Sequence, residues 1–141
     1  MRSFLYSIIL AGVIIYFQSC DVIGPGRPTY TNELFRIKVD SFSLPVNPVF
    51  SIDTLKITFW GTIGNDGCYS FAHFQRATTS NQLDLVLWGR NQRTSEQTCT
   101  QQIVKLDGKQ FFNYPVSGGD YIVVIHQPDG SLMQKTIYIH P

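Results

Sequence analysis

Apolar and polar side chains alternate along most of this chain from residue 35 onward. In the clearest stretch, residues 55–60, three apolar side chains alternate with Lys, Thr and, at the end, Trp60. Residues 83–88 repeat the pattern with three leucines and end in Trp88. A period of two is typical of a β-strand with one buried face, and no convincing 3.6-residue helical period occurs beyond residue 35. The pattern therefore predicts an all-β fold.

Turn-forming residues separate these stretches at short intervals. Asp107-Gly108 is the pair that favours a two-residue type I′ hairpin, and Pro128-Asp129-Gly130 marks another reversal. Pro45 and Pro48 confine the residues around them to an edge or irregular segment. Short strands joined by such turns, seven or eight in all, predict an antiparallel β-sandwich. The expected strands are 35–39, 55–63, 68–76, 83–88, 102–106, 109–114, 121–126 and 132–139.

The first twenty residues have the order of a secretory signal. A basic residue precedes an apolar run of about 14 residues, shorter than the roughly 18–20 that span a bilayer, and Ser19 stands directly before Cys20. Residues 16–20 resemble the lipobox of a bacterial lipoprotein signal, in the relaxed form found in the Bacteroidetes group, although Phe17 and Gln18 differ from the usual leucine and small residue. The resemblance implies cleavage before Cys20 and acylation, with palmitate for example, of that residue. An ordinary cleaved signal, an uncleaved anchor and a buried helix remain alternatives.

The resemblance divides the chain into three parts. Residues 1–19 would form the signal, as a helix, residues 20–33 the lipidated cysteine and a flexible tether rich in Gly and Pro, and residues 34–141 one β-sandwich domain. We expect a protein of the bacterial cell envelope, in the outer membrane in preference to the inner one. Its contact with the membrane would come from the lipid on Cys20, and the side of the membrane stays open.

Three cysteines suggest one lipid site and one disulfide. An exported chain meets an oxidising compartment, so Cys68 and Cys99 are expected to pair while Cys20 carries the lipid. Zinc is the weaker alternative, because no histidine lies at ligand spacing from these cysteines. We expect no metal and no cofactor.

A tyrosine near the start of an apolar strand adds a fold-level resemblance. Gly119-Asp120-Tyr121 resembles the tyrosine corner of immunoglobulin-like and fibronectin-like domains. The resemblance implies an immunoglobulin-like sandwich in which Tyr121 is buried and its hydroxyl reaches backbone a few residues upstream. The positions of Cys68 and Cys99 differ from those of the inter-sheet bridge in antibody domains.

Charge and motifs exclude several functions. The chain has 11 Lys+Arg and 10 Asp+Glu, without clusters, so it offers no surface for nucleic acid. It contains no GxSxG, HExxH, phosphate-binding GxxxxGK or CxxC motif, and no catalytic residue is assigned.

The two tryptophans are the best candidates for a functional surface. If the aliphatic sets of their strands face the core, Trp60 and Trp88 point outward as a pair that could bind protein or sugar; simple packing is the alternative. The leading hypothesis is a non-catalytic binding or structural module with an unidentified protein partner. A groove beside the tryptophans would favour carbohydrate instead, and a flat apolar patch would favour protein. An enzyme, of hydrolytic type, is the least favoured reading. A concave pocket that joins His73, His126 or His140 to a carboxylate would revive it, at the expense of the binding module.

Overall fold

The computed structural model describes residues 29–115 and 117–141. The predictions for the signal, for Cys20 and for most of the tether lie outside these residues. The described residues form strands and no helix, which confirms the all-β prediction, and they contain no helix long and apolar enough to cross a membrane. The strands are β1 (Tyr30–Arg36), β2 (Ser41–Ser43), β3 (Val49–Phe50), β4 (Leu55–Trp60), β5 (Thr62–Gly64), β6 (Tyr69–Thr78), β7 (Gln82–Thr94), β8 (Val104–Lys105), β9 (Lys109–Asn113), β10 (Gly119–His126) and β11 (Leu132–His140).

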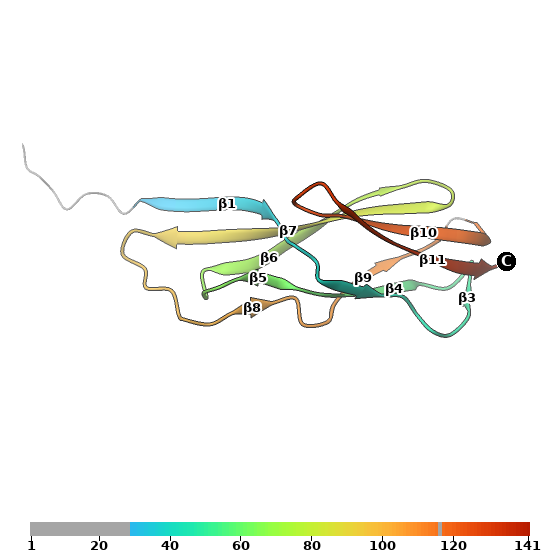
Figure 1. The fold of residues 1–141 in the computed structure, drawn as a ribbon, viewed down its shortest axis with the longest axis horizontal. Helices are drawn as coiled ribbons and strands as arrows, with labels where there is room; N and C mark the ends of the chain where they lie inside the picture. Colours follow the sequence, from blue (N-terminus) through green and yellow to red (C-terminus); the bar gives the residue numbers. More distant parts are fainter. Residues whose placement is uncertain (1–28, 116) are drawn as a thin grey trace, which may run out of the picture.

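The long strand β7 organises the larger sheet, whose order is β1-β7-β10-β11-β3 with β6 on the other side of β7 (Figure 1). β1 pairs with the second half of β7, from Trp88 to Thr94, and β10 pairs with the first half, from Gln82 to Leu85. β1 and β10 therefore follow one another along one side of β7, while β6 pairs along the opposite side. A smaller sheet, β2-β4-β9, and the pair β5-β8 form the other layer of the domain (Figure 1).

The pairing differs from the predicted antiparallel arrangement. β10 runs parallel to β7, and β11 runs parallel to β3, so the larger sheet is mixed. Residues 90–94, which lie outside the expected strands, belong to β7, and residues 30–33, expected to be tether, belong to β1. These segments are polar, yet backbone hydrogen bonds between β1, β7 and β6 hold them in the sheet whatever their side chains.

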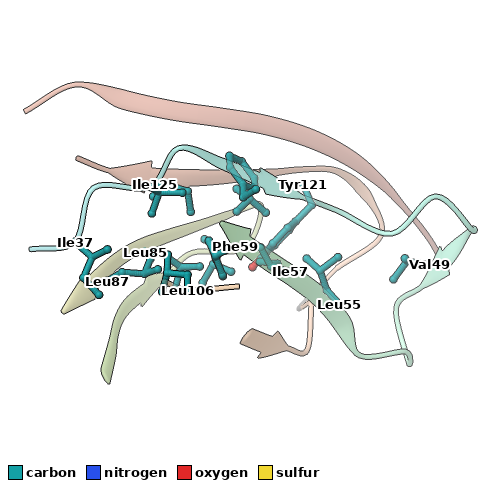
Figure 2. Packing of buried hydrophobic residues seen from close by; sticks show 14 of the residues in the cluster. Ile37, Val49, Leu55, Ile57, Phe59, Leu85, Leu87, Leu106, Tyr121 and Ile125 are labelled. Carbon is teal, nitrogen blue, oxygen red and sulfur yellow. The ribbon is translucent and has the colours of Figure 1, made fainter. Parts of the chain in front are cut away.

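The core lies between the two layers and contains the residues that alternation predicted (Figure 2). Leu55, Ile57 and Phe59 of β4 are fully buried from one side, and the three leucines of β7 are fully buried from the other. The outward residues of both strands, Trp60 and Trp88 included, therefore lie on opposite outer faces of the domain. Full burial of one such side chain contributes about 1.5–3 kcal/mol, so these two strands are central to stability.

The predicted turn at Asp107-Gly108 is present, but the predicted hairpin is not, because β8 pairs with β5 and β9 pairs with β4. Both residues have positive φ, 42° and 77°, as a type I′ turn requires, and they join β8 to β9. The turn brings Asp107 next to the junction of β4 and β5. That junction carries the candidate site.

Candidate functional site

An open hollow of about 300 Å³ lies at the junction of β4 and β5. Trp60, the last residue of β4, is 39% exposed at its edge. The volume is at the lower end of the range for ligand pockets, so the hollow suits a small ligand or one unit of a longer one. Its lining residues are Asp40, Trp60, Gly61, Thr62, Lys105 and Asp107.

Backbone hydrogen bonds bring three distant segments together here. The amide of Asp40 donates to the Trp60 carbonyl at 2.9 Å, and the amide of Leu106 donates to the Gly61 carbonyl at 2.9 Å. The segments that carry Asp40 and Asp107 thus lie on the two sides of the β4–β5 junction. A Cβ at Gly61 would lie 2.6 Å from the Lys38 carbonyl oxygen, so only glycine allows this close approach.

Gln127 holds the Asp40 side of the hollow from the interior. Its side chain is 4% exposed and pairs with the backbone of Val39 in both directions. The amide of Val39 donates to Gln127 Oε1 at 3.0 Å, and Gln127 Nε2 donates to the Val39 carbonyl at 2.8 Å. The Gln127 side chain thus makes the two hydrogen bonds that the backbone of a neighbouring strand would otherwise make with Val39, the residue before Asp40. The sequence analysis missed this residue, because nothing in the local pattern of Gln127-Pro128 signals a partner 88 residues away.

The polar side chains around the hollow have no partners within the described part of the chain. The side chains of Asp40, Trp60, Thr62, Lys105 and Asp107 take part in none of the hydrogen bonds or ion pairs found among residues 29–115 and 117–141. Their two carboxylates, one ammonium, one hydroxyl and one indole N–H are free to bind water or a ligand.

Trp88 lies in different surroundings, on the outer face of the larger sheet. Its indole Nε1 donates to Gln75 Oε1 at 2.9 Å, and its ring stacks with that of His73 at a centroid distance of 6.2 Å. The Arg36 guanidinium carbon lies 5.8 Å from the centroid of the same ring. Because Arg36 and His73 come from the strands on either side of β7, neighbours flank the indole from both sides. Trp60 and Trp88 therefore do not form the predicted pair on one surface, because they belong to different sheets.

A histidine and a carboxylate meet on the same outer face. His126 Nε2 lies 2.8 Å from Asp84 Oδ1, and Gln82 Nε2 donates to Asp84 Oδ2 at 2.8 Å. They lie beside a hollow of about 160 Å³, the feature stated above as favouring an enzyme over a binding module. The hollow is small, and its six described lining residues include no Ser, Thr or Cys that could act as a nucleophile. The pair could exchange a proton with a bound water, which keeps an acid–base reaction open.

The other two histidines lie apart from any carboxylate pairing among the described residues. His73 stacks on Trp88, and His140 packs against Phe50 and Tyr138 at centroid distances of 5.4 and 5.0 Å. Neither adds a catalytic group to the Asp84–His126 pair.

The predicted cysteine pair is confirmed. Cys68 and Cys99 form a disulfide with a Cα–Cα distance of 5.4 Å, within the usual range of about 4.4–6.8 Å. Asp66 lies beside them, where its carboxylate accepts the Cys68 amide at 3.0 Å and pairs with Arg93. The side chains of Asp66, Cys68 and Cys99 lie close enough to hold a metal ion, but the two sulfurs are joined in a disulfide and are therefore not thiolate ligands.

Tyr121 is buried as predicted, but its partner differs. The side chain is 1% exposed, and its hydroxyl accepts a hydrogen bond from Asn113 Nδ2 at 3.1 Å, where backbone was expected. Asn113 lies at the end of β9 in the smaller sheet and is itself buried, so the bond joins the two layers. Burial raises the pKa of Tyr121 above 10.0, and the hydrogen bond from Asn113 opposes this only in part.

Comparisons of the chain with protein-family models, with curated proteins and with solved structures give no match. The Trp60 hollow, the Asp84–His126 pair and the sequence itself therefore carry what can be inferred about function.

Proposed function

We propose that this protein is a saccharide-binding module of the bacterial cell envelope, attached to the membrane by lipid on Cys20, with catalysis at the Asp84–His126 pair as a second candidate function. The observation that carries the binding site is the exposed Trp60 at a hollow whose polar side chains are unpaired within the described chain. The apolar face of a sugar ring can pack on an indole, while its hydroxyl groups donate to carboxylates and accept from Lys and Thr. A hollow with exposed aromatic and polar side chains suits carbohydrate. A protein partner would instead be expected to bind a flat apolar surface.

The attachment rests on the sequence. The short apolar run, Ser19 and Cys20 support a lipoprotein signal, and Gly and Pro between residues 24 and 28 support a flexible tether. The mature protein should carry an acylated Cys20 and lack residues 1–19, as measured by mass spectrometry of membrane extracts. Cys20→Ser should release the protein from the membrane fraction, and an intact N-terminus would contradict the proposal.

We also propose an immunoglobulin-like relationship for the domain. The buried Tyr121 at the start of β10 and the antiparallel pairs β4–β9 and β10–β11 support it, while the parallel pair β10–β7 would be a departure from that plan. The relationship would be tested by structures of relatives whose strand order is intermediate between the immunoglobulin-like plan and the sheet with the parallel β10–β7 pair.

Binding at Trp60 can be tested with mature protein purified from membranes in detergent. Titration with a panel of neutral, acidic and amino oligosaccharides should reveal a ligand that changes indole fluorescence. Trp60→Ala should abolish this change, whereas Trp88→Phe should retain it. Binding to no saccharide, or binding that Trp60→Ala leaves intact, would contradict the proposal.

A hydrolytic enzyme is the second candidate, and the contact of His126 with Asp84 is the observation that favours it. Incubation of each bound oligosaccharide with the protein, followed by mass spectrometry, would detect cleavage. Products that disappear with His126→Asn would establish catalysis and replace the binding module. Intact oligosaccharide after prolonged incubation would support binding alone.

A further inference from the structure

We infer that the saccharide bound at Trp60 carries a free, positively charged amino group. This inference rests on the proposed function and narrows its ligand to one class, the amino sugars with an unacetylated amine. Three features of the hollow support it: the two carboxylates, their lack of ion-pair partners and the exposed indole.

The two segments that carry the carboxylates flank the β4–β5 junction on its two sides, and both carboxylate residues line the hollow. Asp40 follows the segment that Gln127 anchors, and its own amide is bonded to the Trp60 carbonyl. Asp107 follows Leu106, whose amide is bonded to the carbonyl of Gly61 on the other side of the junction. A group held in the hollow beside Trp60 therefore shares it with two negative charges, which favours a cation.

Neither carboxylate is neutralised by a neighbour in the described chain. The ion pairs found in residues 29–115 and 117–141 join Arg93 to Asp66 and His126 to Asp84, and neither involves Asp40 or Asp107. Lys105 also lines the hollow, so the formal charge of its lining is −1, from two carboxylates and one ammonium. A ligand with one positive charge would neutralise this excess, whereas a uronic acid would increase it.

The indole adds an attraction of its own for a cation. A positive group within about 6 Å of the centroid of an exposed indole gains about 0.5–1 kcal/mol from the ring quadrupole. Trp60 can provide this because no cation lies over its ring among the described residues, whereas the ring of Trp88 has Arg36 beside it. The polar lining and the small volume favour a sugar unit over a lysine-rich peptide.

The test compares three β-1,4-linked hexasaccharides on the full mature protein by isothermal titration calorimetry. One contains glucosamine, the second N-acetylglucosamine and the third glucose, so the first two differ in the charge of the amine. We expect the glucosamine hexamer to bind about tenfold more tightly at low salt, because two exposed ion pairs and one cation–π contact are gained. This preference should shrink as salt is raised, since exposed charges are screened.

Matched variants assign the preference to the hollow. Asp40→Asn and Asp107→Asn should each weaken glucosamine binding about two- to fivefold and leave binding of the neutral hexamers unchanged. Asp120→Asn, which removes one exposed carboxylate from β10, is the control of equal charge and should have no effect.

The outcomes separate this inference from the proposed function. Equal affinity for the three hexamers, lost in Trp60→Ala, would overturn the amine preference and leave saccharide binding in place. Binding to none of them would count against both. Binding of an oligolysine peptide, with no saccharide bound, would replace the sugar by a cationic protein segment.

Discussion

Trp60 at the end of β4 and Trp88 within β7 follow the same alternating pattern of apolar residues, but the polar side chains around them differ in whether they are hydrogen-bonded. Around Trp88, the indole N–H, Gln75, Asp84 and His126 are bonded to one another or to neighbouring side chains. Around Trp60, the polar side chains of the hollow have no such bonds within the described residues. Two outward tryptophans thus differ in their surroundings: the polar groups near Trp88 are bonded to protein, and those near Trp60 are available to a ligand.

The difference suggests a division between stability and binding. Polar side chains that are bonded to one another resist rearrangement, and a ligand would have to break those bonds before binding. Unpaired side chains at a hollow exchange water for ligand without that cost. The outer face of β6, β7 and β10 is therefore expected to support the fold, and the Trp60 hollow to bind.

The largest effect is expected when Gln127, which holds the Asp40 side of the hollow from the interior, is removed. Gln127→Ala should lower the free energy of unfolding by about 3 kcal/mol, because two hydrogen bonds are lost and the buried Val39 amide and carbonyl are left unpaired. Urea denaturation followed by circular dichroism measures this, and ligand affinity should fall as well because Asp40 moves. Gln134→Ala, on the exposed face of β11, is the control. A loss below 1 kcal/mol would contradict the supporting role of Gln127.

Substituting each tryptophan sharpens the comparison directly. Trp88→Ala should destabilise the protein by about 2 kcal/mol, because a half-buried ring and its hydrogen bond to Gln75 are removed. Trp60→Ala should cost about half as much, because the side chain is more exposed and makes no hydrogen bond with a described residue. Ligand binding should show the reverse order. If Trp60→Ala were the more destabilising change, Trp60 would be a packing residue.

The Tyr121 hydroxyl is a polar group that is hydrogen-bonded inside the core, in contrast to the exposed groups of both outer faces. Tyr121→Phe should lower stability by about 1 kcal/mol at neutral pH, because Asn113 loses an acceptor inside the core. The folded pKa is raised above 10.0, so the stability that this group contributes is fully present below pH 10 and is lost as pH rises through the folded value. Denaturation between pH 8 and pH 11 should therefore show a steeper alkaline loss for the natural protein than for the variant. Parallel curves would contradict a buried phenol.

The smallest effect is expected at the Asp84–His126 pair. Both side chains are partly exposed, at 25% and 40%, so Asp84→Asn should change stability by less than about 1 kcal/mol. Saccharide affinity at the Trp60 hollow should stay the same, which calorimetry can check. A large loss of affinity would show that the two outer faces are coupled, which would contradict a separation of stability and binding between them.

Local patterning predicted the strands whose side chains alternate, because one face of each is buried. It identified the buried faces of β4 and β7, the turn at Asp107-Gly108 and the outward position of Trp60, but not that the strands flanking this turn pair with β5 and β4. It could not identify the end of β7 or the start of β1, because backbone pairing between distant segments holds these polar residues in the sheet.

The candidate site was predicted only through its tryptophan. Asp40 and Asp107 are ordinary loop residues in the sequence, and only the hydrogen bonds to the carbonyls of Trp60 and Gly61 bring their segments together. The relation of Gln127 to Val39 is equally invisible, since a side chain that pairs with a distant backbone leaves no periodic signal. The sequence thus indicated which aromatic residue to examine, and tertiary contacts supplied the polar groups around it.

The pairing of β1 with β7 has a mechanical consequence. The start of β1 and the C-terminus lie at opposite ends of the elongated domain (Figure 1). A pull between these two ends acts along β1, and its seven residue pairs with β7 are loaded together in shear instead of opening one by one. Forced unfolding is governed by the rate of unfolding, and breaking all seven residue pairs at once has a higher barrier than breaking them in turn. This geometry therefore slows rupture under tension. β1, the first strand of the described chain, is thereby the one best placed to bear a load.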